Sequence, residues 1–289
     1  MSEPAPAANV YALDPSSDWR FFARLPDGRA LVSCHARNAV LIVDGEGSEI
    51  GRLAFEFGKP EGIAVHPGDG RVLVVDRHHH CIRVFDSCLN PMRSIATDHQ
   101  PPRQLNQPVG IAISPSGNSV WVADNENHRV LQLDADGKYV STLGSGCIGT
   151  APGCMFCPCG VAVFDHPAHG ELVIVSEWGN GRVQVFRASS GGEVFAMYGG
   201  VPHAHHVTVD SHANIYVSEY ATRKIKIFNL NGAEYRCAGE LPSAVSLVAA
   251  AADLDTIVTQ NRLVRVPSRY HSKKRVKRGL TADEKEQAL

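Results

Sequence analysis

Three histidines and a cysteine are adjacent in the stretch VVDRHHHCIRVFD, which spans residues 74–86. Imidazole nitrogens and thiolates are common zinc ligands, so His78, His79 and His80 first suggest a metal site. However, three neighbouring side chains in a four-residue turn cannot all point at one ion. We interpret the run instead as a polar turn that presents histidines to a partner, with a charge that changes near neutral pH.

A second group of candidate metal ligands lies in GSGCIGTAPGCMFCPCG, residues 144–160. Four thiolates close in sequence could complete a tetrahedral structural zinc site, and the CMFC stretch has the usual two-residue gap between ligands. Against zinc, CPC leaves a gap of only one residue, and no second well-spaced pair follows. We expect free thiols that pack a loop and no cofactor, with structural zinc as the alternative. The candidate ligands are Cys147, Cys154, Cys157 and Cys159.

Composition narrows the class of protein and its compartment. The 289 residues carry a formal net charge of -2, so no overall basic field favours nucleic acid or an anionic membrane. The longest apolar run, residues 243–252, is far shorter than the roughly 20 residues of a membrane helix, and MSEPAPAANV does not resemble a signal peptide. We expect a soluble cytoplasmic protein without a membrane partner, whose eight cysteines are reduced thiols or metal ligands. The basic cluster from Lys273 to Arg278 leaves a nuclear location open.

The histidine-rich stretch is one copy of a repeat. Related stretches are VADNENHRVLQLD from Val122, VSEWGNGRVQVFR from Val175 and VSEYATRKIKIFN from Val217, with looser copies from Val32 and Val258. Four copies are preceded by a second shared element: PEGIAV, PVGIAI, PCGVAV and AHHVTV. Short runs rich in Val, Ile and Phe, separated by Gly, Pro, Asn and Asp, indicate β-strands. A period of 41 to 53 residues fits four strands and their loops.

Six such units predict an all-β fold, a six-bladed β-propeller of four-stranded antiparallel blades. The last unit supplies only three strands, so we expect the N-terminal strand NVYAL, residues 9–13, to complete the last blade. The predicted organisation is an N-terminal segment with this closing strand (residues 1–18), the propeller (19–267) and a basic then acidic C-terminal tail (268–289).

The PxG[IV]A[VI] element, the Vx[DE] turn and the strand after it resemble NHL repeats, over about residues 20–266. The resemblance implies an NHL propeller, a fold that serves for protein binding, for RNA binding and, in the peptidylglycine amidating lyases, for zinc-dependent catalysis. In those lyases three histidines sit at the second position of the inner-strand element. The corresponding residues here include only one histidine, so we expect no catalytic residues. These residues are Glu61, Val109, Cys159, His205 and Ser243.

The loops that lead into the inner strands and the turns between second and third strands should open on one face of a propeller. Aromatic and arginine side chains anchor protein partners well, so we expect a non-catalytic scaffold that binds a protein through this face. RNA binding is the alternative, and a metal-dependent enzyme resembling the amidating lyases is a weaker one. The sequence indicates no oligomeric state. The binding-face candidates are Arg37, Glu61, Arg77, His78, His79, His80, Asn127, His128, Arg129, Trp178, Asn180, Arg182, His203, His205, His206, Tyr220 and Arg223.

The acid of three turns is followed five residues later by a cation. Arg129, Arg182 and Lys224 follow Asp124, Glu177 and Glu219 in this way. A catalytic pair repeated around a ring has no chemical purpose. We therefore predict structural ion pairs that hold the turns, exposed to solvent and each worth less than about 1 kcal/mol.

Overall fold

The computed structural model describes residues 19–45, 47–95, 104–190, 192–222 and 224–230. It also describes the backbone of four short strands at 239–242, 247–250, 256–259 and 263–265. The closing strand expected at residues 9–13 and the tail from residue 268 lie outside the described residues. Within the described residues, no helix is long and apolar enough to cross a membrane.

The described strands form antiparallel sheets in which each strand pairs with the next in sequence. The first blade contains β1 (Trp19–Arg24), β2 (Ala30–Cys34), β3 (Ala39–Val43) and β4 (Glu49–Arg52), and the second contains β5 (Pro60–Val65), β6 (Val72–Asp76), β7 (Cys81–Phe85) and β8 (Pro91–Ile95). The third contains β9 (Ile111–Ile113), β10 (Ser119–Asp124), β11 (Arg129–Asp134) and β12 (Tyr139–Leu143), and the fourth contains β13 (Pro158–His166), β14 (Gly170–Glu177), β15 (Arg182–Arg187) and β16 (Glu193–Tyr198). The fifth contains β17 (Ala204–Val209), β18 (Asn214–Glu219), β19 (Lys224–Asn229) and β20 (Gly239–Pro242). Short 3-10 helices are η1 (Arg77–His79), η2 (Asn125–Asn127) and η3 (Ala188–Ser190).

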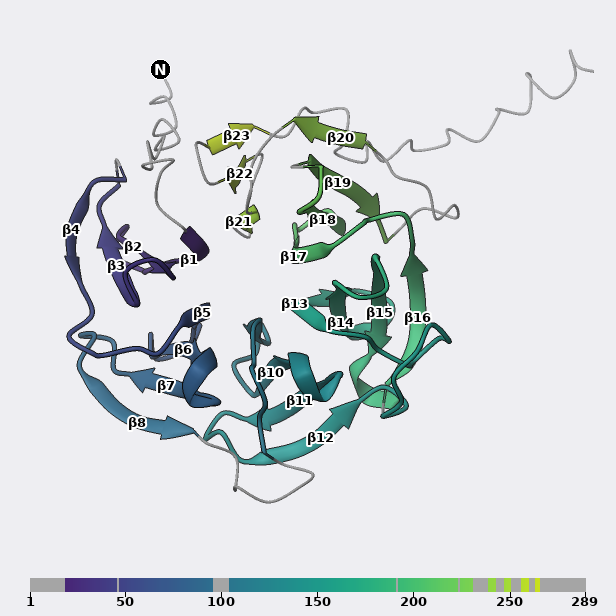
Figure 1. Cartoon of the computed structure of the whole chain (residues 1–289), viewed down its shortest axis with the longest axis horizontal. Coiled ribbons are helices and arrows are strands. Elements are labelled where there is room, and N and C mark those ends of the chain that lie inside the picture. The colour runs from purple at the N-terminus through teal and green to yellow at the C-terminus, as the bar shows by residue number, and fades with distance from the viewer. Residues whose placement is uncertain are drawn as a thin grey trace, which may run out of the picture.

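The sheets stand around a common axis, with β1, β5, β13 and β17 near the centre and β4, β8, β12 and β16 at the outside (Figure 1). A three-stranded sheet of β21 (Leu247–Ala250), β22 (Thr256–Thr259) and β23 (Leu263–Arg265) follows the five four-stranded blades. The prediction of an all-β propeller is therefore confirmed, but the described strands complete five four-stranded blades and one three-stranded sheet, where six four-stranded blades were predicted.

Burial explains the sequence pattern of the strands. The second strands β2 and β6 are buried at every residue, because both of their faces pack against neighbouring blades. The outer strand β8 is exposed at four of its five residues and reads PMRSI. The core therefore lies in layers between adjacent blades. One such layer joins residues of the second and third blades, with Leu73 and Val120 among its members.

Three glycines let the inner strands approach one another closely. A Cβ atom on Gly62 would lie 2.7 Å from Val109 O, and one on Gly160 would lie 2.7 Å from His205 O. Gly110 makes the same kind of approach to the backbone of the fourth blade. The glycine of the PxG[IV]A[VI] element thus sets the distance between blades at the axis.

Candidate functional site

The acid that ends each second strand ties the turn to the loop leading into the inner strand. Asp76 Oδ1 accepts a hydrogen bond from Gly58 N at 3.0 Å, and Asp124 Oδ1 accepts one from Asn106 N at 2.6 Å. Glu177 Oε2 accepts one from the backbone amide of the corresponding loop in the fourth blade, at 3.0 Å. All three carboxylates are fully buried. The prediction that the ion pairs are exposed is wrong for Asp124 and Glu177, because the loop covers each acid.

The cations that pair with these acids lie on the third strand. Arg129 Nε is 2.8 Å from Asp124 Oδ2, and Arg182 Nε is 2.7 Å from Glu177 Oε1, as predicted from the five-residue spacing. In the fifth blade, Lys226 lies seven residues after the acid, and its Nζ is 3.6 Å from Glu219 Oε2.

The three histidines of η1 and its end have three different environments. His79 Nδ1 lies 2.7 Å from Asp76 Oδ2, within the same turn. His80 adopts a left-handed backbone conformation, with φ of 53°, and its Nδ1 accepts a hydrogen bond from Gln107 N of the next blade at 3.0 Å. His78 is exposed. The histidine-rich turn therefore contributes one contact inside its blade, one between blades and one free surface position.

His128 repeats the contact between blades. It also has φ of 53°, and its Nδ1 accepts a hydrogen bond from Cys157 N of the fourth blade at 3.1 Å. The two histidines occupy the last position before their third strands, where the turn requires a positive φ. From this backbone conformation each imidazole nitrogen reaches the neighbouring loop, so His80 and His128 act as links between successive blades.

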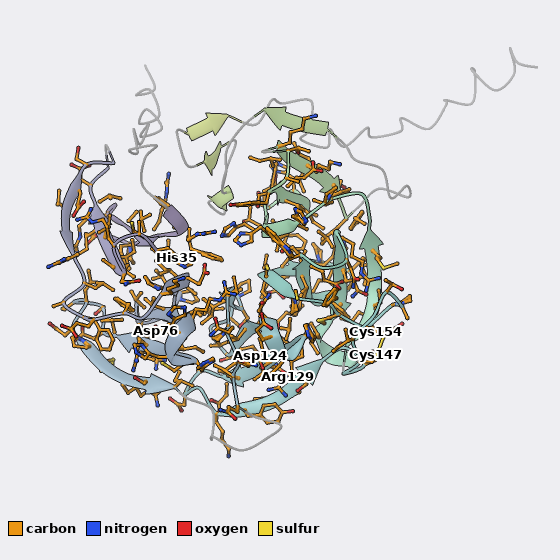
Figure 2. The ribbon with its side chains drawn as sticks, viewed as in Figure 1. His35, Asp76, Asp124, Arg129, Cys147 and Cys154 are labelled. Carbon is orange, nitrogen blue, oxygen red and sulfur yellow. A yellow bond between two sulfur atoms is a disulfide. The ribbon has the colours of Figure 1, made fainter. Side chains whose placement is uncertain are left out.

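The cysteine loop does not gather four thiols. Cys147 and Cys154 form a disulfide, so the expectation of reduced cysteines is wrong for this pair (Figure 2). The backbone brings them together, because Met155 N donates to Cys147 O at 3.0 Å. Cys157 and Cys159 remain free thiols. Across the described part of the chain, no group of three or more His, Cys, Asp or Glu side chains is arranged to hold a metal ion.

A pocket of about 510 Å³ opens where these turns and the inner strands meet. Most of its residues lie at two repeated positions. The second residue of each inner-strand element, as in PEGIAV or PVGIAI, and its equivalent in the first blade form what we call the inner ring: Arg20, Glu61, Val109, Cys159 and His205. The residue after the turn acid, or after Cys34 in the first blade, forms the turn ring: His35, Arg77, Asn125, Trp178 and Tyr220. The pocket lining consists of Arg20, Arg77, Val109, Asn125, Glu126, Cys157, Cys159, Trp178, His205 and Tyr220.

Glu61 is a buried charge beside this pocket, only 1% exposed. Its Oε1 lies 3.0 Å from His35 Nε2 and 3.3 Å from Arg77 Nη1. Its Oε2 has no hydrogen-bond partner among the described residues. Burial acts to raise the pKa of Glu61, but the contact with His35 and the neighbouring basic groups outweigh burial and lower the pKa below its usual value. Glu61 is therefore ionised at neutral pH and has one carboxylate oxygen without a donor.

His205 and His206 form a buried pair next to Glu61. Their Nδ1 atoms are 2.9 Å apart, so one of the two nitrogens must carry the proton of a shared hydrogen bond. Burial lowers the pKa of His205 to about 4 and also lowers the pKa of His206. Both imidazoles are consequently neutral at physiological pH. The His206 ring also packs edge-on against Phe21 of the first blade, with ring centroids 4.0 Å apart.

Aromatic side chains form one wall of the pocket. The Trp178 ring stacks on His203, with centroids 4.5 Å apart and an interplanar angle of 11°. Tyr220 also contacts Trp178, at 5.2 Å between centroids, and is 39% exposed. Two cysteine thiols also line the pocket. Burial raises the pKa of Cys159 to about 12 and raises the pKa of Cys157 as well. These thiols are uncharged and weakly nucleophilic at neutral pH.

The structure distributes the predicted site residues over several environments. Arg77, Trp178, His205 and Tyr220 line the pocket, and Glu61 lies directly beside it. Other candidates hold the turns and blades together, namely His79, His80, Asn127, His128, Arg129, Asn180 and Arg182. His203 and His206 pack against pocket residues, His78 is exposed, and Arg37 pairs with Glu49 at the surface. Arg223 lies outside the described residues.

Sequence reasoning missed Arg20. It occupies the position in β1 that Glu61 has in β5, because Trp19 pairs with Cys34 as Pro60 pairs with Asp76. The first repeat lacks both the proline and the turn acid, so the correspondence is visible only by counting back from the second strand.

The comparisons with known proteins agree with this geometry. The NHL repeat family model matches residues 57–85 and 105–133, which cover the lead into the inner strand through the third strand of two successive blades. No curated protein matches the chain. A solved nidogen/laminin complex matches with 17% identity and a TM-score of 0.65, covering 79% of this chain and 81% of that chain.

Virginiamycin B lyase from Staphylococcus aureus, as the selenomethionine-substituted protein, matches with 14% identity and a TM-score of 0.60, covering 89% of this chain and 87% of that chain. A catalytically inactive variant of that lyase with Quinupristin matches with 16% identity and a TM-score of 0.60, covering 86% and 80%. At these identities the neighbours show the fold alone. Together with the repeated blade element and the shared architecture, these matches show a β-propeller whose second and third blades match the NHL repeat.

Proposed function

We propose that this propeller is a non-catalytic platform that binds a protein partner through the loop face, defined as the turns between second and third strands and the loops into the inner strands. The observation that carries the proposal is the pocket at the centre of this face. Arginine, tryptophan and tyrosine dominate the residues that anchor protein interfaces, and all three types line the pocket. A pocket volume of several hundred Å³ is also usual for a ligand-binding site.

The contacts of the arginines weigh against RNA as the partner. Arg129 and Arg182 are held by buried carboxylates, and Arg77 lies against Glu61. RNA binding depends on cations that are free to neutralise phosphates, which paired arginines supply poorly.

The side chains also give little support to catalysis by a metal. Glu61, Cys159 and His205 share the inner ring, but His205 Nδ1 is engaged by His206, and the described residues include no group of three His, Cys, Asp or Glu side chains arranged to hold a metal ion. Among structural neighbours, the nidogen propeller is found with laminin, which is a precedent for a propeller of this fold binding a protein. Because virginiamycin B lyase is also a structural neighbour, enzymatic activity is the alternative function.

Affinity capture from native lysate, with and without nuclease, tests the proposal. We expect a nuclease-resistant protein partner that is captured by the wild type and lost with Trp178→Ala and Tyr220→Ala. Val140→Ala is the matched control, because Val140 is 52% exposed on the outer strand β12. Thermal melts confirm that each variant is folded. Capture that disappears with nuclease, or that Val140→Ala reduces as much as Tyr220→Ala, contradicts the proposal.

A further inference from the structure

The Cys147–Cys154 disulfide closes the long loop between β12 and β13 on itself, with a sequence separation of 7. Residues 145–148 and 150–152 are exposed, so solvent surrounds most of this small covalent ring. Cys147 is itself exposed, whereas Cys154 is 9% exposed, and a thiol in solution therefore meets the bond from the Cys147 side. Exposed disulfides are more easily reduced than structural ones and include those that serve in regulation.

A hydroxyl group lies beside both sulfur atoms of this bond. Ser145 Oγ is 3.0 Å from Cys147 Sγ, and it donates a hydrogen bond to Cys154 Sγ at 3.4 Å. A hydrogen bond to a thiolate stabilises its charged form, and a thiol with a lower pKa leaves faster in thiol–disulfide exchange. Ser145 is therefore placed to assist the departure of Cys154 when Cys147 is attacked.

The closed ring is also docked on its own blade. Gly153 N donates to Gln184 Oε1 at 2.9 Å, and Asn180 Nδ2 donates to Gly149 O at 2.8 Å. These contacts require the loop backbone in one conformation. The cross-link restricts the conformations that the undocked loop can adopt, so it favours the docked loop. Breaking the cross-link should increase the fraction of undocked loop.

The end of the same loop holds the aromatic wall of the pocket. Trp178 N donates to Cys157 O at 3.0 Å, and Gly179 N donates to Phe156 O at 3.1 Å. The Phe156 ring packs so closely on Gly179 that it leaves no room for a Cβ atom there. Cys157 and Trp178 both line the pocket. The position of Trp178 consequently depends on a loop whose preceding residues are tied together by the disulfide.

We propose that Cys147–Cys154 is a reversible redox site for a dithiol reductant, and that its reduction loosens the loop and the Trp178 wall of the pocket. A thiolate of the dithiol attacks Cys147 Sγ, the S–S bond breaks, and Cys154 leaves as a thiolate that takes up a proton. The second thiol of the reductant then loses its proton and attacks the mixed disulfide. This step releases the Cys147 thiolate, which is protonated in turn. Two electrons and two protons pass to the protein, and the reductant becomes a disulfide.

The redox site goes beyond the proposed function, because it requires no partner. Amide hydrogen exchange of the full chain, followed by NMR with and without dithiothreitol, tests it. Alkylation and mass spectrometry first establish that Cys147 and Cys154 have become thiols. We then expect exchange at Met155, Trp178 and Gly179 to be at least about tenfold faster, because the cross-link no longer restricts the undocked loop. This comparison uses the wild-type chain, so it does not depend on any variant folding correctly.

One internal control and two variants sharpen the test. The Leu53 amide, which donates to Val40 O in the first blade, should keep its exchange rate on reduction. The double variant Cys147→Ser, Cys154→Ser should exchange like the reduced wild type and should not respond to dithiothreitol. Ser145→Ala should keep the exchange rates of the oxidised wild type but should be reduced about twofold or more slowly, because the leaving thiolate loses its donor.

Several results would overturn the inference. A bond that resists millimolar dithiothreitol in the folded chain is a structural disulfide and no redox site. Unchanged exchange at Trp178 and Gly179 after complete reduction means that the disulfide does not hold the wall. An equal acceleration at Leu53 means that reduction lowers the stability of the whole chain rather than of this loop. Reduction of Ser145→Ala at the wild-type rate removes the role given to the hydroxyl group.

Discussion

Replacing Arg182 by methionine should destabilise the propeller far more than removing an ordinary surface charge. Arg182 is 6% exposed, and its Nε lies 2.7 Å from Glu177 Oε1. Its guanidinium also donates to Thr150 O, to Ala151 O at 3.2 Å and to Cys154 O at 2.8 Å, which holds the long loop of the fourth blade onto β15.

The Arg182→Met variant leaves Glu177 buried without its cation and removes one donor from each of three loop carbonyls, of which Cys154 O keeps Gln184 Nε2 at 2.9 Å. Breaking a buried pair by removing one partner typically costs about 3–5 kcal/mol. Glu177 retains the donors Asn180 Nδ2 at 2.6 Å and Gln184 Nε2 at 2.8 Å, so we expect the lower half of that range. Arg37→Met is the matched control. Its partner Glu49 is exposed, and the loss should be below about 1 kcal/mol.

Urea denaturation followed by circular dichroism measures both free energies of unfolding. The variants should share the wild-type slope and differ in midpoint. If Arg182→Met costs no more than Arg37→Met, the buried pair does not hold the loop, and the structural role given to the repeated acids is wrong.

Three further predictions concern the histidines and the glycines. His80→Ala should cost about 1 kcal/mol in urea denaturation because it removes the link to the next blade, whereas His78→Ala, two residues earlier, should cost almost nothing; equal losses would refute the link. The pKa of His205 is depressed in the folded state, so below pH 6.5 the unfolded chain binds more protons than the folded chain. The free energy of unfolding should therefore fall by up to about 3 kcal/mol as the pH drops from 6.5 to 4. His205→Gln should flatten this part of a profile of stability against pH, and an unchanged slope would contradict the assignment. Gly160→Ala should destabilise by more than about 2 kcal/mol because its Cβ would lie 2.7 Å from the neighbouring backbone, whereas Gly51→Ala, with its nearest atom at 3.8 Å, should be nearly neutral by the same measurement.

The blade architecture could be predicted from the sequence because its determinants are local. The glycine of each PxG[IV]A[VI] element marks a close approach of backbones, as at Gly62 and Gly160. The acid of each Vx[DE] turn marks a buried contact to the preceding loop, as at Asp76 and Asp124. Each signal needs only a few neighbouring residues, so it is repeated in register along the chain.

The partner of each acid was harder to predict. Positions five and seven residues after the acid lie on the same face of the third strand, because side chains alternate with a period of two. Arg129 takes the first position in its blade, whereas Arg83 takes the second and lies 3.1 Å from Asp76 Oδ2. In the fifth blade Lys226 likewise lies seven residues after Glu219, a position that the five-residue spacing does not predict.

The disulfide and the pocket depend on contacts that the sequence does not display. The spacing of CMFC drew attention to Cys154 and Cys157, but the backbone contact between residues 147 and 155 pairs Cys154 with Cys147 instead. The burial of Glu61 likewise results from the convergence of blades, and from its contact with His35 in the blade before it. Figure 2 shows His35 near the centre of the ring, on the side of the first blade.

The most direct test of protein binding by the loop face is photocrosslinking at Tyr220. A chain that carries p-benzoylphenylalanine in place of Tyr220 is irradiated in native lysate beside a chain that carries it in place of Val140 on the outer strand β12. We predict a discrete, nuclease-resistant protein adduct from position 220 and none of the same mass from position 140. The same adduct from both positions, or an adduct from position 220 that consists of nucleic acid, would contradict the account.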